Sequence, residues 1–299
     1  MTEAPASAPT VAPLDVESRM GIEVRNIGIP PRPAILDQIN REMANSDPDF
    51  NHLAELIGSD VALSASLIKV ANSPYYGFSK KVRSVQEALL VLGLKVTVRT
   101  IAGLSLKAVF KRAPSFERFW DASAGTARVS GWLVQQLPRG HGIRAEDAYT
   151  FGLFRDCGIP VLMIPFPEYR GILHKANEEA LLPFTDVEDA ALSINHAIVG
   201  AELAENWLLP EDIHQAIRYH HALSALLSKP SPGISPAAQR LIALAQLAEY
   251  LIQQNTDQDH NHTQEWPKLG AACLALLGLG DDDLPALVAG SGTVVHEDE

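Results

Sequence analysis

The stretch SVQEALLVLGLKVTVRTIAGLSLKAVF (84–110) is the part of this sequence that best indicates how the chain folds. It opens on Ser84 with Glu87 three positions later, a pairing that can satisfy the free backbone N–H groups at the start of a helix. Apolar residues then recur at helical spacing in two runs, with a break near Gly93. Short strands around 96–98 are an alternative, but the surrounding pattern favours two consecutive helices.

The segments before this stretch also predict helices. Residues 29–43 (IPPRPAILDQINREM) place a rigid proline turn before apolar side chains at helical spacing. Residues 49–78 predict two short amphipathic helices, the second of which ends before Pro74. Residues 1–26 are instead rich in Ala, Pro, Thr and Ser and poor in large apolar groups, so burial cannot offset the entropy of ordering them. We expect a flexible leader there.

The rest of the chain repeats the helical pattern between Pro, Gly and Asp breaks. The predicted helices are 116–137, 145–158, 167–180, 186–207, 210–223, 235–254 and 266–278. Because no fixed period links them, a solenoid is not expected. The sequence therefore predicts an all-α, multi-helix bundle in which an N-terminal helical part (27–114) and a second part (115–255) share one core. A loop and helices at 256–299 are expected to pack on this domain.

Composition narrows the class of protein. With 46% hydrophobic and 20% charged residues the chain belongs among globular proteins. A net charge of −12 disfavours binding to nucleic acid. The two cysteines, Cys157 and Cys273, form no CxxC pair, which fits a reducing cytoplasm. No export signal is legible, and no uninterrupted apolar run approaches the roughly 18 residues of a membrane helix. We expect a cytoplasmic protein without a membrane anchor.

Several pieces of the sequence, in this order and spacing, resemble the HDOD family, a relative of the HD and HD-GYP metal-dependent phosphohydrolases. They are IPPRPAIL (29–36), the stretch 60–77 that ends in ANSPYYG, SVQEALLVLGL (84–94), Trp120, GLFRDCGIPVL (152–162), NHAIVGAELAENWLLP (195–210) and IRYHH (217–221). The resemblance covers residues 27–255. It implies a helical bundle of the HD-domain type and a regulatory role in bacterial signal transduction.

The resemblance also implies where a metal centre would lie. HD hydrolases hold divalent metal through a His, a His-Asp pair and a later Asp, because imidazole and carboxylate together fix a cation that activates water. The corresponding residues here are Ala122, the pair Arg155-Asp156, and Gln246. Only Asp156 keeps a ligand, and Arg155 is a permanent cation that cannot coordinate metal. We therefore expect no metal and no other cofactor.

Three downstream histidines, His196, His220 and His221, correspond to further metal ligands of these relatives. Together with Asp156 they are candidates for a residual metal or ligand site. The alternative is that these imidazoles only form hydrogen bonds across a helix junction and so hold the fold together.

A second group of candidate residues lies between the first helices. Asn72, Ser73, Tyr75 and Tyr76 belong to the ANSPYYG stretch, and Lys80 and Lys81 follow it. A helix end with exposed aromatic and basic side chains would suit an acidic partner or a phosphorylated ligand. The alternatives are local packing of the two tyrosines and a solvated basic surface.

Taken together, these observations predict a non-catalytic signalling module. Its partner is expected to be a regulatory protein in trans or a signalling nucleotide, since no attached signalling domain is legible. A metal-dependent phosphohydrolase with an atypical site is the alternative, and a homodimer with a purely structural role is a third reading.

Overall fold

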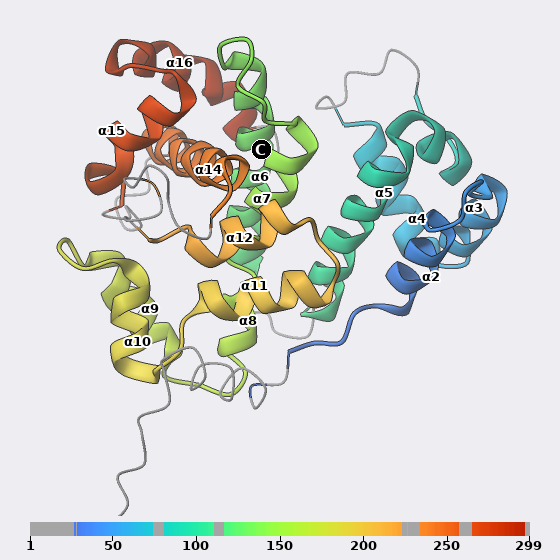
Figure 1. Cartoon of the computed structure of the whole chain (residues 1–299), viewed down its shortest axis with the longest axis horizontal. Helices are drawn as coiled ribbons and strands as arrows, with labels where there is room; N and C mark the ends of the chain where they lie inside the picture. Colours follow the sequence, from blue (N-terminus) through green and yellow to red (C-terminus); the bar gives the residue numbers. More distant parts are fainter. Residues whose placement is uncertain are drawn as a thin grey trace, which may run out of the picture.

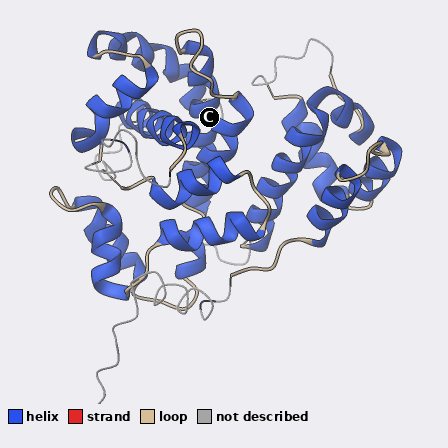
Figure 2. Ribbon diagram, viewed as in Figure 1, coloured by secondary structure: helices blue, strands red, loops and turns tan. Residues whose placement is uncertain are grey.

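The computed structural model of the chain describes residues 27, 29–73, 81–110, 117–222, 226, 234–256 and 265–296. Every regular element in these ranges is helical, as Figure 2 shows. The all-α prediction is therefore confirmed.

The N-terminal part forms its own layer on one side of the molecule (Figure 1). It consists of α2 (Ala34–Met43), α3 (Phe50–Gly58), α4 (Val61–Ala71) and α5 (Val85–Val109). The first three helices all pack against α5. Leu36, Ile57 and Leu67 bury their side chains completely there, so α5 is the centre of this layer.

Helix α5 has the start and the break that its sequence predicts. Ser84 is the N-cap, and its hydroxyl accepts a hydrogen bond from the Glu87 backbone N–H at 3.1 Å. Gly93 has φ 73° and ψ 164°, a conformation that glycine adopts without steric cost, and it divides the helix with a kink. By length and composition, α5 is the one helix in the described ranges that could cross a membrane. Its kink and its packing against four other helices are those of a core helix.

The second part carries the remaining helices. They are α6 (Glu117–Gln136), α7 (Ala145–Phe154), α8 (Gly158–Leu162), α9 (Tyr169–Glu178), α10 (Phe184–Leu192), α11 (His196–Asn206), α12 (Glu211–Tyr219), α14 (Pro236–Asn255), α15 (Trp266–Leu277) and α16 (Leu284–Val295). Helix α14 lies at the centre, in contact with α6, α7, α12, α15 and α16. It buries nearly the whole of one side in an Ala- and Leu-rich surface.

The two parts are joined by polar contacts as well as by a continuous core. Arg99 of α5 forms an ion pair with Asp147 of α7, and both side chains are largely buried. The Trp207 indole Nε1 donates to the Pro30 carbonyl oxygen at 3.2 Å, which ties the segment before α2 to the end of α11. The chain entering the N-terminal layer is thus held against the second part.

Two of the predicted helices are wrong in the same way, because each is interrupted. The predicted helix 186–207 is divided into α10 and α11, since Ser193 adopts a left-handed φ of 57° and Asn195 then caps α11. The predicted helix 145–158 breaks after Phe154, and α8 starts only at Gly158. Both interruptions place candidate site residues at helix ends.

Candidate functional site

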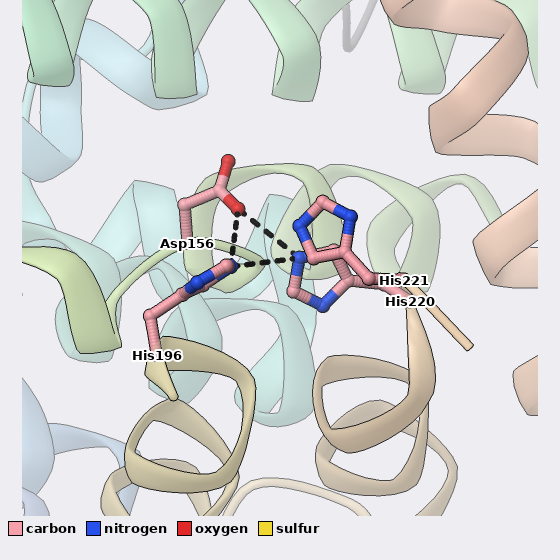
Figure 3. A group of neighbouring side chains, drawn as sticks. All are labelled: Asp156, His196, His220 and His221. Carbon is pink, nitrogen blue, oxygen red and sulfur yellow. Dashed lines mark hydrogen bonds and ion pairs between the residues drawn. The ribbon is translucent and has the colours of Figure 1, made fainter. Parts of the chain in front are cut away.

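Four side chains that are far apart in the sequence meet in one cluster, as Figure 3 shows. They are Asp156, His196, His220 and His221, and their potential ligand atoms all lie within 4.8 Å of one another. His196 Nε2 is 3.2 Å from His220 Nε2, and Asp156 Oδ1 is 3.2 Å from His220 Nε2 and 3.5 Å from His196 Nε2. The three imidazoles are buried, whereas the Asp156 side chain keeps 24% of its surface exposed. We call these four residues the histidine cluster.

Each residue of the histidine cluster comes from a helix end. Asp156 lies in the turn between α7 and α8, His196 is the first residue of α11, and His220 and His221 follow α12. The cap of α11 is a hydrogen bond from the Ile198 backbone N–H to the Asn195 side-chain oxygen at 3.0 Å. Side chains at helix ends can converge from several directions, and this convergence creates the cluster.

A close approach of two backbones brings Asp156 next to His196. Gly158 begins α8 directly against α11, and a Cβ at this position would lie 2.0 Å from the His196 carbonyl oxygen. The same Cβ would lie 2.8 Å from the backbone nitrogen of Gly200. Only a residue without a side chain permits this contact. Gly158 is therefore a geometric requirement of the site.

Each imidazole is held through its Nδ1 atom. His196 Nδ1 lies 2.8 Å from Glu188 Oε2, His220 Nδ1 lies 2.7 Å from the Ile217 carbonyl oxygen, and His221 Nδ1 lies 3.1 Å from Glu265 Oε2. Because these partners are acceptors, each Nδ1 carries a hydrogen and each Nε2 is left to face the cluster. Carboxylates or carbonyls behind the histidines are the usual way of orienting imidazoles in metal sites.

Glu188 is itself held in place. It is completely buried and accepts a hydrogen bond from the Tyr169 hydroxyl on its other carboxylate oxygen. Burial and the charge of Glu188 raise the pKa of Tyr169 well above its ordinary value, so the phenol remains a donor. On the other side, the Phe184 ring stacks on the His221 ring with centroids 4.7 Å apart.

The electrostatic environment separates the pKa values of the three histidines. Burial alone would lower the pKa of His196, but Glu188 and Asp156 outweigh it and raise the pKa to about 10. Burial and the neighbouring His221 lower the pKa of His220 to about 3, and burial with the charge of His196 lowers that of His221 well below its ordinary value. His196 is therefore protonated and positively charged, whereas the His220 and His221 imidazoles are neutral.

Arg155 occupies the other side of Asp156. Arg155 is 4% exposed, and its Nε and Nη2 atoms donate to Asp156 Oδ2 at 3.2 and 3.0 Å. Nη2 also bonds to Glu249 of α14. Burial would raise the pKa of Asp156, but the charge of Arg155 and a hydrogen bond from the protonated His196 hold it well below its ordinary value. Asp156 is thus a permanent carboxylate with one oxygen committed to Arg155.

The donor set fits one small divalent cation. The Nε2 atoms of the three histidines and Asp156 Oδ1 are the atoms that would hold it, and three nitrogens with one oxygen suit zinc or a similar ion. The site has no room for a second cation beside Asp156, since Oδ2 already faces the Arg155 guanidinium. A bound cation would also have to replace the His196 proton.

The other sequence-predicted metal positions offer no ligands. Ala122 lies exposed on α6. Gln246 is buried in α14, and its amide Nε2 donates to the His220 carbonyl oxygen at 3.4 Å, so this side chain supports the turn that carries His220. Sequence reasoning missed Glu188, Glu249 and Glu265. Glu249 lies in a largely apolar helical stretch (244–251), which also describes many solvated positions. Glu188 lies between Asp186 and Asp189 and Glu265 follows a polar segment, so the sequence carries no signal for these two.

The predicted partner-binding residues are only partly described. Tyr75, Tyr76 and Lys80 lie outside the described residues, while Lys81 is exposed and Ser73 is half-buried. The Asn72 amide accepts a hydrogen bond from the Val82 backbone N–H at 2.8 Å and donates one to the Val82 carbonyl oxygen at 2.7 Å. Asn72 therefore joins the end of α4 to the segment before α5. Its role in partner binding stays a prediction.

Comparison with known proteins gives a family-level match. The model of the HDOD domain matches residues 29–223. An uncharacterized protein of Treponema pallidum (strain Nichols) is 29% identical over 213 residues, which are 70% of this chain and 41% of that protein. The chain thus spans about two fifths of the length of this relative.

Solved structures agree on the fold. An HDOD domain protein of unknown function from Geobacter sulfurreducens is 25% identical, with a TM-score of 0.65 and coverage of 95% of this chain and 96% of that one. A structure from Marinobacter aquaeolei VT8, whose name proposes a signal transduction protein, is 20% identical with a TM-score of 0.65. The match covers 94% of this chain and 64% of the Marinobacter chain. A Shewanella amazonensis SB2B structure, whose name proposes a metal-dependent phosphohydrolase, has 15% identity, a TM-score of 0.64 and coverage of 94% and 98%. These last two likenesses concern the fold alone.

Proposed function

Because this chain belongs to the HDOD domain family, we propose that it is a non-catalytic signalling module that binds a regulatory protein or a nucleotide-like ligand. The organisms of its relatives support a bacterial origin. The partner acts in trans, and the module works in the cytoplasm, either as a monomer or as a homodimer.

The observation that carries this proposal is the position of Arg155. In the HD hydrolases a histidine precedes the aspartate, whereas here a buried guanidinium binds Asp156 Oδ2 and Glu249. Burial opposes its charge, but Asp156 and Glu249 outweigh this and raise the pKa of Arg155 above its ordinary value, so its charge is permanent. A fixed cation in this place repels a second metal ion and supplies no ligand. Four potential ligand atoms lie together, but the resemblance to HD hydrolases implies further ligands that this chain lacks.

The test combines metal analysis with an activity assay on the purified full chain. We expect substoichiometric transition metal by elemental analysis and no hydrolysis of phosphodiesters in the presence of added Mn²⁺. Arg155→His should not produce activity, because Ala122 and Gln246 still lack donor atoms suited to a metal. Metal-dependent turnover by the unmodified chain would overturn the proposal.

Binding of a partner needs a separate measurement. The unmodified chain and a Lys81→Glu chain serve as matched baits in extracts of the native cell, followed by a direct Kd with each purified candidate. Lys81 is exposed, so reversing its charge tests the basic surface without disturbing the core. A regulatory protein that binds the unmodified chain directly and the variant more weakly supports the proposal. If the partner binds both chains with equal affinity, the basic surface has no part in partner binding.

A second candidate function is a metal-dependent phosphohydrolase with a one-metal site. It is favoured by the donor set itself, since four ligand atoms lie within 4.8 Å of one another and carboxylates support two of the imidazoles. A divalent ion bound there would activate water against a phosphoester. This candidate predicts stoichiometric metal in the purified protein and loss of both metal and hydrolysis in His196→Ala.

A further inference from the structure

A pocket of about 200 Å³ opens beside the histidine cluster. Thr185 of α10 and Asn195 before α11 line one side, and Arg218, Tyr219 and His221 at the end of α12 line the other. His221 is the one residue that belongs to both the pocket and the histidine cluster. A molecule in the pocket would therefore touch the wall of the cluster without entering it.

The polar groups that the pocket leaves free can all donate hydrogen bonds. No described residue bonds to the Arg218 guanidinium or to the hydroxyls of Thr185 and Tyr219. Asn195 is fully engaged instead, because its amide nitrogen donates to both carboxylate oxygens of Asp189 and its oxygen accepts from the backbone of α11. A guanidinium has five N–H donors and no acceptor. These groups suit a ligand that carries several acceptor oxygens.

The charge around the pocket is also suited to an anion. The described side chains that line the pocket include one cation, Arg218, and no carboxylate. Thr185 lies in the first turn of α10 and Asn195 is the N-cap of α11, and helix N-termini carry partial positive charge. Arg218 is half-buried at the same place. The residues that line the pocket thus contribute one positive charge on a chain whose net charge is −12.

We infer that this pocket binds the phosphoryl group of a small phosphorylated ligand, with Arg218 as its main partner and the Thr185 and Tyr219 hydroxyls as further donors. This inference rests on the proposed function, because it names the ligand class of the signalling module. The volume of about 200 Å³ lies below the roughly 300–1,000 Å³ of pockets that enclose whole drug-sized ligands. Only the phosphoryl group and the atoms next to it are enclosed, and the remainder of the ligand lies outside.

The test uses the full chain after removal of divalent metal by chelation, so that phosphate bound to a metal ion cannot imitate the result. Inorganic phosphate, a nucleoside monophosphate and acetate are titrated by calorimetry or NMR. The variant is Arg218→Gln, and Arg139→Gln is the matched control, because Arg139 is exposed in the turn after α6 and loses the same charge. Thr185→Val removes one hydroxyl at nearly constant volume.

We expect phosphate and the nucleoside monophosphate to bind the unmodified chain and to shift the ring signals of His221. Arg218→Gln should raise both Kd values at least tenfold, Thr185→Val by a smaller factor, and Arg139→Gln by less than twofold. The inference is overturned if neither phosphate compound binds, if acetate binds as tightly as phosphate, or if Arg218→Gln and Arg139→Gln bind alike. Such a failure leaves the metal, hydrolysis and partner measurements unchanged, so it is distinguishable from failure of the proposed function.

Discussion

Replacing Arg155 by Met should destabilise the fold by an amount that depends strongly on pH. Arg155 is 4% exposed, and its guanidinium is bonded to both Asp156 and Glu249. Removing one partner of a buried charge network leaves the others uncompensated, at a cost of about 3–5 kcal/mol in the free energy of unfolding. Arg139→Met, at an exposed position, should change it by less than about 0.5 kcal/mol.

The sign of the pH dependence follows from the two carboxyl groups. Without Arg155 the pKa of Glu249, which burial already raises, rises further, and Asp156 loses the partner that lowers its own pKa. A carboxyl whose pKa is higher in the folded than in the unfolded chain destabilises the fold above its unfolded pKa, and the penalty fades as the pH falls towards that value. The difference between the variant and the unmodified chain should therefore be larger at pH 7.5 than at pH 5.

Urea unfolding followed by circular dichroism at these two pH values measures the effect. Adding Glu249→Leu to Arg155→Met should restore part of the lost stability, because apolar side chains often replace a buried ion pair without loss. The loss of a buried ion pair should lower the free energy of unfolding by about 3 kcal/mol or more. A decrease below about 1 kcal/mol for Arg155→Met would therefore refute the argument. An equal loss at both pH values would do the same.

Three further predictions concern the histidine cluster and the core. Gly158→Ala places a Cβ 2.0 Å from the His196 carbonyl oxygen, so α8 and α11 must separate. We expect the free energy of unfolding, measured by heat or urea, to fall by about 1–3 kcal/mol. An unchanged stability would contradict the close approach of the two helices. The affinity of the histidine cluster for Zn²⁺ should rise by up to about tenfold per pH unit between pH 6 and pH 8, because the ion displaces the proton that a pKa of about 10 keeps on His196. Calorimetry in two buffers would detect the released proton. An affinity that does not vary with pH would argue that Zn²⁺ binds at another site. Burial raises the pKa of Cys157 and raises that of Cys273 to about 12. Ellman's reagent should therefore react slowly with the native chain, and both thiols should react fully only after the chain is unfolded. Rapid labelling of the native chain would show that the core opens.

Much of the fold could be predicted from the sequence, because helical spacing of apolar residues is a local signal. The start of α5 at Ser84 and its break at Gly93 depend on such local chemistry, and both agree with the structure. The division of 186–207 into two helices could not be predicted in the same way. It depends on Ser193 in a left-handed conformation and on the cap at Asn195, which interrupt an apolar pattern that continues on both sides.

The site was predictable only in its innermost residues. Asp156 and the three histidines could be named together through resemblance to a known family, since short motifs carry them. The carboxylates behind the imidazoles could not, because Glu188 and Glu265 reach the histidines through contacts between separate helices. Sequence spacing records no such contact. The role of Arg155 was predictable as a missing ligand, but not as one member of a network that includes Glu249.

The helices that follow residue 223 have a practical consequence for anyone who expresses a shortened chain. The family match ends at residue 223, yet Glu249 of α14 bonds to Arg155 and Glu265, at the start of α15, bonds to His221. In a fragment that ends at residue 223, Arg155 would lack its partner Glu249 and His221 would lack its partner Glu265. The fragment would also expose the apolar face that α14 covers. Ligand or metal measurements on such a fragment would describe a different site from that of the full chain.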